Sequence, residues 1–369
     1  MGSEEAGTTS SIHSLPGGLP THKAEETSCV VALDTRDKTT TPTISVILIS
    51  YRKRPYLYRA IQSVQQQSLD TSKFEVIWVT HFDDWIARKL LTPMNTLILI
   101  SSTRSLSGQV AEAITYSRGK VVSFLDDDDE FCSDKLRRVL QISHSTDHFC
   151  YYNAQILIDS NGATIGRVPS LHLKSKSRSR RTKVRKIGPS EIAGVSNLPS
   201  FNASSLAISR EVVFKYINQL KTLRSTNLDI ALVCFAVSDS VTFFIDSHPL
   251  TKYRVHGDQA VSVKDDVLYR GDIMWNSREA EMLADFQLLI SLCPKSKYAE
   301  MLYHYSFRYR VTFHLYHYTS KVAYLQKLYW YFKRGRPRIS IDTIMILQLS
   351  CVYLLSPRAI DAMVRRFRI

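Results

Sequence analysis

Between residues 44 and 129, short apolar runs alternate with segments of helical spacing, and this alternation constrains the fold most strongly. The run at 44–50 is almost continuous in Ile, Val and Leu, as expected for a parallel strand covered on both faces. Leu57, Ile61 and Val64 then follow at helical spacing. Such repeats predict βαβ units and an open α/β sheet. The predicted strands are 44–50, 74–79, 96–100 and 121–125, with helices at 56–67 and 109–117.

The whole chain divides into three parts. Residues 42–265 are predicted to form one mixed α/β domain with helices on both faces of the sheet, and residues 266–369 a helical region. Residues 1–41 are rich in Ser, Thr and Gly without a period, which predicts a disordered leader. Because that leader lacks the apolar segment of a signal peptide, we expect a cytoplasmic protein. The later predicted elements are helices at 135–142, 211–220 and 229–237 and strands at 149–158, 201–209, 241–245 and 251–255.

Four consecutive aspartates, residues 126–129, directly follow the predicted strand 121–125. Ligands of an open α/β sheet collect at the carboxyl ends of its strands. Neighbouring carboxylates raise one another's pKa, and a divalent cation removes this cost. Asp126 and Asp128, at D-x-D spacing, are therefore expected to face one metal-binding pocket. The alternative is a solvated acidic turn, with Asp129 as the N-cap of the next helix.

Several motifs follow one another in a fixed order along the α/β domain. They are residues 44–51, 56–64, 117–129 with Lys135 and Leu136 after them, 201–205 and 253–256. As an ordered set over residues 44–262, they resemble the family 2 glycosyltransferases, in particular prokaryotic and archaeal glycan-assembly members. The resemblance implies a GT-A fold and an inverting transfer from a nucleotide-sugar donor to a glycan or lipid-linked acceptor. It also implies a divalent cation, Mn²⁺ or Mg²⁺, on the donor diphosphate.

The resemblance places several residues of this chain at the donor. Asp128 would be the direct metal ligand, and Asp126 would contact the nucleotide ribose or the metal, with Asp127 beside it. Ser50 and Tyr51, at the end of the first strand, belong to the same donor side.

Two loops of the donor side each have two alternative interpretations. Arg54, in the basic turn 52–54, is expected to reach donor phosphates, although charge on a surface turn is an equal alternative. The family usually carries Asp-Asp-Gly-Ser after the second strand, whereas this chain has Thr-His-Phe-Asp-Asp at 80–84. Asp83 or Asp84 could substitute, with His81 stacking or hydrogen-bonding, and less stringent donor recognition is the alternative.

The resemblance also suggests a catalytic base and a second metal ligand. The family takes the base from an acidic residue that opens the helix behind the acceptor pocket, where this chain offers Asp229. The alternative is that Asp229 is a first-turn residue whose charge interacts favourably with the helix dipole. Where the family often has Glu-Asp, this chain has Thr226 and Asn227. His256 would point at the metal or the diphosphate, a structural histidine being the alternative.

The net charge of +14 is concentrated in two segments. The basic insert, residues 174–187, holds eight Lys and Arg and no acidic residue, and the chain from Lys321 onward holds ten against two acidic residues. Such peripheral positive charge is typical of segments that bind an anionic surface, including the cytosolic face of a membrane. For the insert, the alternative is a solvated loop without a ligand. The insert has no aromatics for base stacking, so no nucleic-acid partner is expected. Residues 339–355 predict an interfacial or packed helix.

Other classes of protein share parts of this pattern. A non-catalytic relative that binds a nucleotide sugar or a glycan would explain the altered 80–84 loop. A nucleic-acid-binding protein is suggested by charge alone, and nucleotidyltransferases also use paired aspartates but lack the 253–256 motif. The six cysteines contain no C-x-x-C pair, which excludes the usual zinc spacings and indicates reduced thiols.

Overall fold

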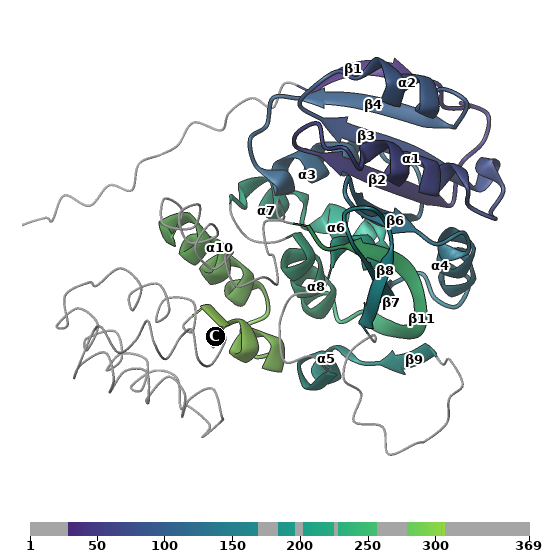
Figure 1. Cartoon of the computed structure of the whole chain (residues 1–369). Helices are drawn as coiled ribbons and strands as arrows, with labels where there is room; N and C mark the ends of the chain where they lie inside the picture. The colour runs from purple at the N-terminus through teal and green to yellow at the C-terminus, as the bar shows by residue number, and fades with distance from the viewer. Residues whose placement is uncertain are drawn as a thin grey trace, which may run out of the picture.

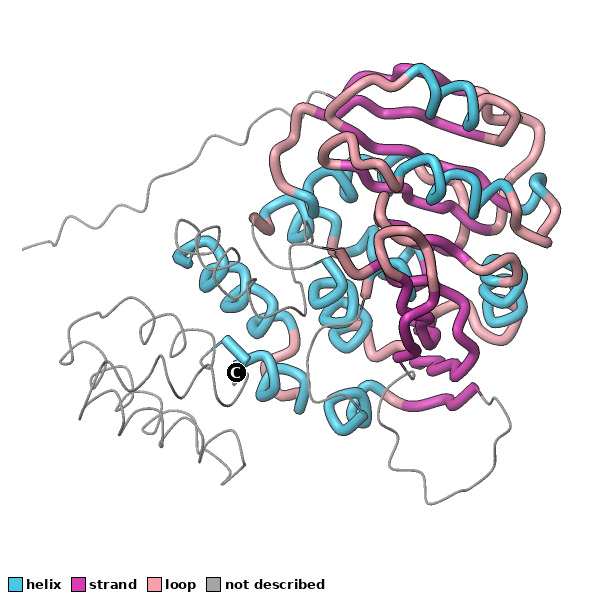
Figure 2. Tube along the Cα trace, in the orientation of Figure 1, coloured by secondary structure: helices cyan, strands magenta, loops and turns pink. Residues whose placement is uncertain are grey.

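The computed structural model describes residues 29–168, 184–195, 202–224, 228–256, 279–303 and 305–306. These residues form an 11-stranded sheet in the order β1-β4-β3-β2-β5-β10-β7-β11-β6, with β8 and β9 paired to β7 and β11. Helices lie on both sides of this mixed sheet, as Figure 1 shows, and Figure 2 traces the strands in magenta between the cyan helices. The predicted α/β fold class is confirmed.

The first half of the sheet is the predicted parallel unit. Its strands are β2 (Ile44–Ser50), β3 (Phe74–Thr80), β4 (Thr96–Ser101) and β5 (Val121–Asp126). Neighbours β4-β3, β3-β2 and β2-β5 all pair in parallel, so their carboxyl ends lie at one edge. Each strand is buried almost throughout, which explains why its sequence is a continuous apolar run rather than an alternating one.

The second half of the sheet mixes strand directions. The strand β10 (Leu206–Ser209) pairs antiparallel with both β5 and β7 (Phe149–Ile158), and β7 pairs parallel with β11 (Thr242–Arg254). The short β6 (Glu130–Phe131) pairs antiparallel with the end of β11, and β8 (Thr164–Val168) pairs antiparallel with β7. The two strands predicted at 241–245 and 251–255 are one strand, β11. Its register shifts on either side of Pro249, because proline has no N–H to donate to the ladder.

Helices cover the two faces of the sheet with separate hydrophobic cores. One core contains residues of α1 (Leu57–Gln65), α2 (Trp85–Leu91) and α4 (Lys135–Ser143). The other contains residues of α3 (Leu106–Tyr116), α6 (Arg210–Lys215), α7 (Ile217–Thr222), α8 (Leu228–Ser238) and α10 (Glu279–Leu292). The helix predicted at 211–220 is broken at Tyr216, whose ring stacks on Phe235 with centroids 4.9 Å apart. Shorter elements are η1 (Thr71–Lys73), α5 (Pro189–Val195) and η2 (Ala203–Ser205).

Two segments predicted as irregular contain strands. The disordered leader predicted at 1–41 is wrong for β1 (Cys29–Asp34), which pairs antiparallel with β4 and takes the free edge of the sheet. The end of the basic insert forms β9 (Val184–Ile187), which pairs antiparallel with β11. Residues 1–28, most of the insert and the basic tail lie outside the described residues.

The start of the predicted C-terminal helical region belongs to the main core. In α10, Met282, Phe286 and Leu289 are buried in the same hydrophobic core as α8. Within the described ranges, every helix is too short or too polar to cross a lipid bilayer.

Candidate active site

The four aspartates form a tight turn, the acidic turn (residues 126–129), between β5 and β6. Asp126 ends β5 opposite Ile49 of β2, and its N–H donates to the Ser204 hydroxyl at 3.0 Å. The Asp129 N–H donates to the Asp126 carbonyl at 3.2 Å, which closes the turn. The acidic turn therefore lies at the carboxyl edge of the parallel strands, where the sequence predicts the ligand site.

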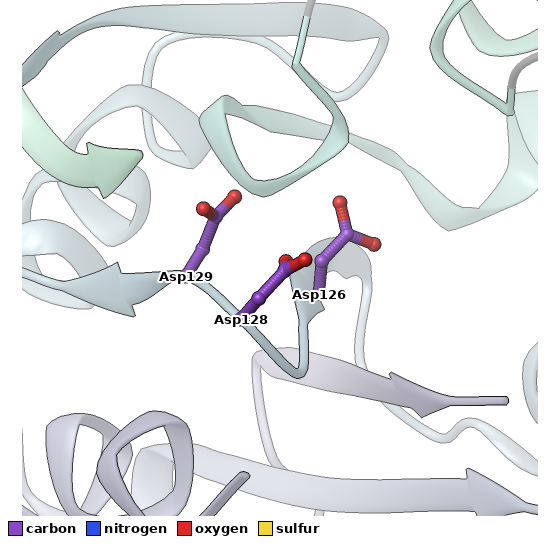
Figure 3. A group of neighbouring side chains, drawn as sticks. All are labelled: Asp126, Asp128 and Asp129. Atoms are coloured by element: carbon purple, nitrogen blue, oxygen red, sulfur yellow. The ribbon is translucent and has the colours of Figure 1, made fainter. Parts of the chain in front are cut away.

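Three carboxylates of the acidic turn come together. Asp126, Asp128 and Asp129 each offer one ligand atom, and these atoms lie within 4.8 Å of one another. Figure 3 shows the three side chains on the same side of the turn. Asp129 is no helix N-cap, since α4 starts at Lys135 with Asp134 in that position.

Burial and mutual repulsion disfavour the charged forms of these carboxylates. Burial raises the pKa of Asp129 to about 7, with Asp128 adding to the rise. Burial and the neighbouring aspartates also raise the pKa of Asp126 well above its usual value. Burial raises the pKa of Asp127 to about 7, although Arg54 opposes that rise, and its Oδ2 is a buried acceptor without a partner among the described residues. Oxygen ligands of this kind suit Mg²⁺ or Mn²⁺, so the acidic turn fits a divalent cation.

Two cationic or ionisable side chains meet the acidic turn at one oxygen. Arg54 Nη1 lies 3.0 Å from Asp127 Oδ1 and 2.5 Å from Asp128 Oδ2. His256 Nε2 lies 3.1 Å from the same Asp128 oxygen. The structure therefore brings Arg54 and His256, predicted from distant parts of the sequence, onto the predicted metal ligand Asp128.

Arg254, which the sequence interpretation did not assign, supports the acidic turn from the protein side. Its buried guanidinium donates to the Asp128 carbonyl at 2.8 Å and pairs with Glu130 at 2.5 Å, while its backbone N–H donates to Asp129 at 2.9 Å. The Tyr56 ring stacks on this guanidinium at 4.7 Å. Arg254 lies inside the 253–256 motif, and that position was the available indication. Asn202 adds a hydrogen bond of 3.0 Å to Asp129.

The ends of β2 and β3 form the neighbouring part of the edge. Tyr51 is 55% exposed and packs edge-on against His81, with ring centroids 4.8 Å apart. His81 is fixed by the Ser101 carbonyl and by Gln109. Ser50 is fully buried, accepts a hydrogen bond from the Trp78 indole at 3.1 Å, and its hydroxyl helps to lower the pKa of Asp127 against the larger effect of burial.

The aspartates of the 80–84 loop have partners of their own. Asp83 is an exposed residue that forms a two-point ion pair with Arg88, at 2.5 and 3.0 Å. Asp84 caps α2 by accepting from the Ala87 N–H at 2.9 Å, and Lys53 lies 2.6 Å from its other oxygen. The structure does not bring Asp83 to the acidic turn.

Asp229 is a buried residue in the first turn of α8. Burial raises the pKa of the Tyr253 phenol, and both the acidic turn and Asp229 raise it further. Asp229 and the acidic turn therefore both act on the Tyr253 phenol through their charges.

Comparisons with known proteins concern the fold and one segment of the sequence. The crystal structure of residues 1–349 of S. aureus TarS in complex with UDP matches with a TM-score of 0.52 at 14% identity, covering 73% of this chain and 72% of that one. The fold is therefore of the GT-A glycosyltransferase type. Residues 45–195, less than half of the chain, match the family described as Glycosyl transferase family 2.

One curated relative also matches this part of the chain. An uncharacterized glycosyltransferase of Nostoc sp. is 29% identical over 128 residues. The match covers 33% of this chain and spans only 39% of the length of that relative.

Proposed function

We propose that the chain transfers a sugar from a nucleotide-diphosphate donor to an acceptor hydroxyl, with a divalent cation on the acidic turn. The observation that carries the proposal is the convergence of Asp126, Asp128 and Asp129 at the carboxyl edge of the parallel strands. These residues lie inside the segment that matches family 2 glycosyl transferases. When bound, the cation would neutralise the charge that develops on the departing nucleoside diphosphate.

Each donor-side residue has a part in this proposal. Asp128, with Asp126 and Asp129, would hold the cation. Arg54 and His256 contact Asp128 and would donate to diphosphate oxygens beside it. Ser50 and Tyr51 would line the nucleoside side of the same edge. Because the S. aureus protein TarS has been crystallised with UDP, we propose a uridine diphosphate sugar as the first donor to test.

The acceptor side rests on Asp229. An inverting transfer needs a base that removes the proton of the acceptor hydroxyl, and such a base contributes about 10²–10⁴-fold to the rate. Asp229 and the acidic turn both raise the pKa of Tyr253, which supports this role. We propose a glycan or lipid-linked acceptor, with the protein cytoplasmic or peripheral at the cytosolic membrane face.

A non-catalytic binding protein is the second candidate function. The observation that favours it is the ion pair of Asp83 with Arg88, since the usual acidic residue of this loop is then not directed to the acidic turn. Such a protein would bind the nucleotide sugar without turning it over.

Turnover of a panel of nucleotide sugars distinguishes these candidates. Wild type is incubated with Mn²⁺ and each donor, and the released nucleoside diphosphate is quantified by ion-exchange chromatography beside Asp128→Asn. A matched control is Asp134→Asn, an exposed aspartate ion-paired with Arg137 outside the acidic turn. Mn²⁺-dependent release of nucleoside diphosphate by wild type and the control, lost in Asp128→Asn, is expected. Donor binding without any release would support the binding protein, and release of pyrophosphate would indicate nucleotidyl transfer.

A further inference from the structure

One oxygen of Asp128 has two nitrogen neighbours. Arg54 Nη1 lies 2.5 Å from Asp128 Oδ2, and His256 Nε2 lies 3.1 Å from it. The same Arg54 nitrogen also reaches Asp127 Oδ1 at 3.0 Å. The guanidinium therefore sits across two carboxylates of the acidic turn, and it is mostly buried, with 22% of its side chain exposed.

A divalent cation bound to Asp128 Oδ2 would compete with the ion pair between that oxygen and the Arg54 guanidinium. A cation such as Mg²⁺, bound to Asp128 Oδ2 at the usual ligand distance of about 2.0–2.1 Å, would stand next to a positive nitrogen 2.5 Å from the same atom. Repulsion between like charges is strong where water is largely excluded. The carboxylate thus has two competing cationic partners, and binding one weakens the hold of the other.

Arg54 has the means to change partners. Its Nε is buried and has no hydrogen-bond partner among the described residues, so its fork of donors is not fully used. Arg54 lies in the loop between β2 and α1. Its side chain can therefore rotate without repacking a strand or a helix. A diphosphate beside the acidic turn would offer the planar pair of oxygens that a guanidinium binds best.

We propose that Arg54 competes with the divalent cation for Asp128 and releases that carboxylate to it when a diphosphate takes the guanidinium. The second half rests on the function proposed above, whereas the first half concerns the metal alone. The consequence is that cation and nucleoside diphosphate strengthen each other's binding by the same factor. Either one alone binds weakly, because the Arg54 contact opposes the cation and the unneutralised aspartates oppose the diphosphate.

The first arm of the test measures Mn²⁺ alone, by electron paramagnetic resonance of free Mn²⁺ and by calorimetry, on the full chain. Arg54→Met removes the competing charge and keeps much of the side-chain volume, so Mn²⁺ should bind about tenfold more tightly. Arg88→Met is the matched control, an arginine of similar exposure paired with Asp83 away from the acidic turn, and should bind Mn²⁺ as wild type does. Arg54→Lys keeps the charge and should stay within about threefold of wild type.

The second arm measures UDP with and without Mn²⁺. In wild type, Mn²⁺ should strengthen UDP binding markedly, and in Arg54→Met that enhancement should shrink by about tenfold. If Arg54→Met binds Mn²⁺ no more tightly than wild type, the inference fails, even where UDP binds. If no variant binds UDP but Arg54→Met still gains Mn²⁺ affinity, the competition stands and the proposed function fails. Should Arg54→Met not fold, Arg54→Gln takes its place, and an Arg54→Gln protein that binds Mn²⁺ no more tightly than wild type would refute the competition.

Discussion

The pH dependence of the free energy of unfolding should reveal the cost of ionising the buried carboxylates of the acidic turn. The variant Asp129→Asn isolates the contribution of one of them. Asp129 is 1% exposed, and its pKa rises from 3.8 to about 7 in the folded chain because of burial and Asp128. A carboxyl whose pKa is raised by folding keeps its proton where the unfolded chain has lost it. Stability therefore falls as the pH rises from about 4 to about 7 and stays lower above that window.

The magnitude follows from the size of the shift. A rise from 3.8 to about 7 corresponds to a loss of about 4 kcal/mol in the free energy of unfolding above pH 7. An asparagine does not titrate, and its carbonyl oxygen can still accept from the Arg254 N–H. Its NH₂ then faces Asn202, whose amide must turn over to accept from it. Without metal, Asp129→Asn should therefore be close to wild type near pH 3.5 and exceed it by about 2–4 kcal/mol near pH 8.

Urea unfolding at a series of pH values in EDTA measures this difference, with Asp134→Asn as a control that should show no such trend. Saturating Mn²⁺ should reverse the order at pH 8, because the cation stabilises the wild-type carboxylates and binds the variant less well. A difference between Asp129→Asn and wild type that stays constant from about pH 4.5 to about pH 8 would refute the electrostatic account of the turn.

Three further perturbations have expected outcomes. Asp229→Asn should lower sugar transfer by about 10²–10⁴-fold while Mn²⁺-dependent UDP binding, measured by calorimetry, stays unchanged; loss of both together would argue against a role as base. Burial lowers the pKa of Lys135 to about 7, so wild-type stability should rise between about pH 7 and about pH 10, and urea titrations of Lys135→Met should lack that slope. An alanine at Gly119 would place its Cβ 2.6 Å from the Ser45 backbone nitrogen, so Gly119→Ala should lose about 1–3 kcal/mol in urea unfolding. Gly166→Ala, whose nearest neighbour lies at 3.6 Å, should change little, and equal effects of the two would contradict the packing argument.

The sequence predicted the parallel half of the sheet well and its edges poorly. Strands β2 to β5 are buried on both faces, so their apolar runs are self-evident in the sequence. The edge strand β1 is stabilised by backbone pairing with β4, and its exposed Val30 and Val31 leave no clear period. Pairing of β9 with β11 likewise depends on backbone partners that are far away in the sequence.

The candidate site divides in the same way. The acidic turn was predictable because its four aspartates directly follow a buried strand. The support by Arg254 was not, since its contacts join residues that lie more than 120 positions apart. For Asp83, spacing in the sequence alone could not show that its carboxylate forms an ion pair with Arg88, one turn into α2.

The most direct test of the central claim is calorimetric binding of UDP to wild type and to Asp128→Asn, with and without Mn²⁺. If the acidic turn holds the cation that binds a donor diphosphate, wild type will bind UDP tightly only with Mn²⁺, and Asp128→Asn will lose that dependence while remaining folded. Mn²⁺-dependent UDP binding of equal strength in Asp128→Asn would contradict the account and place the donor site elsewhere.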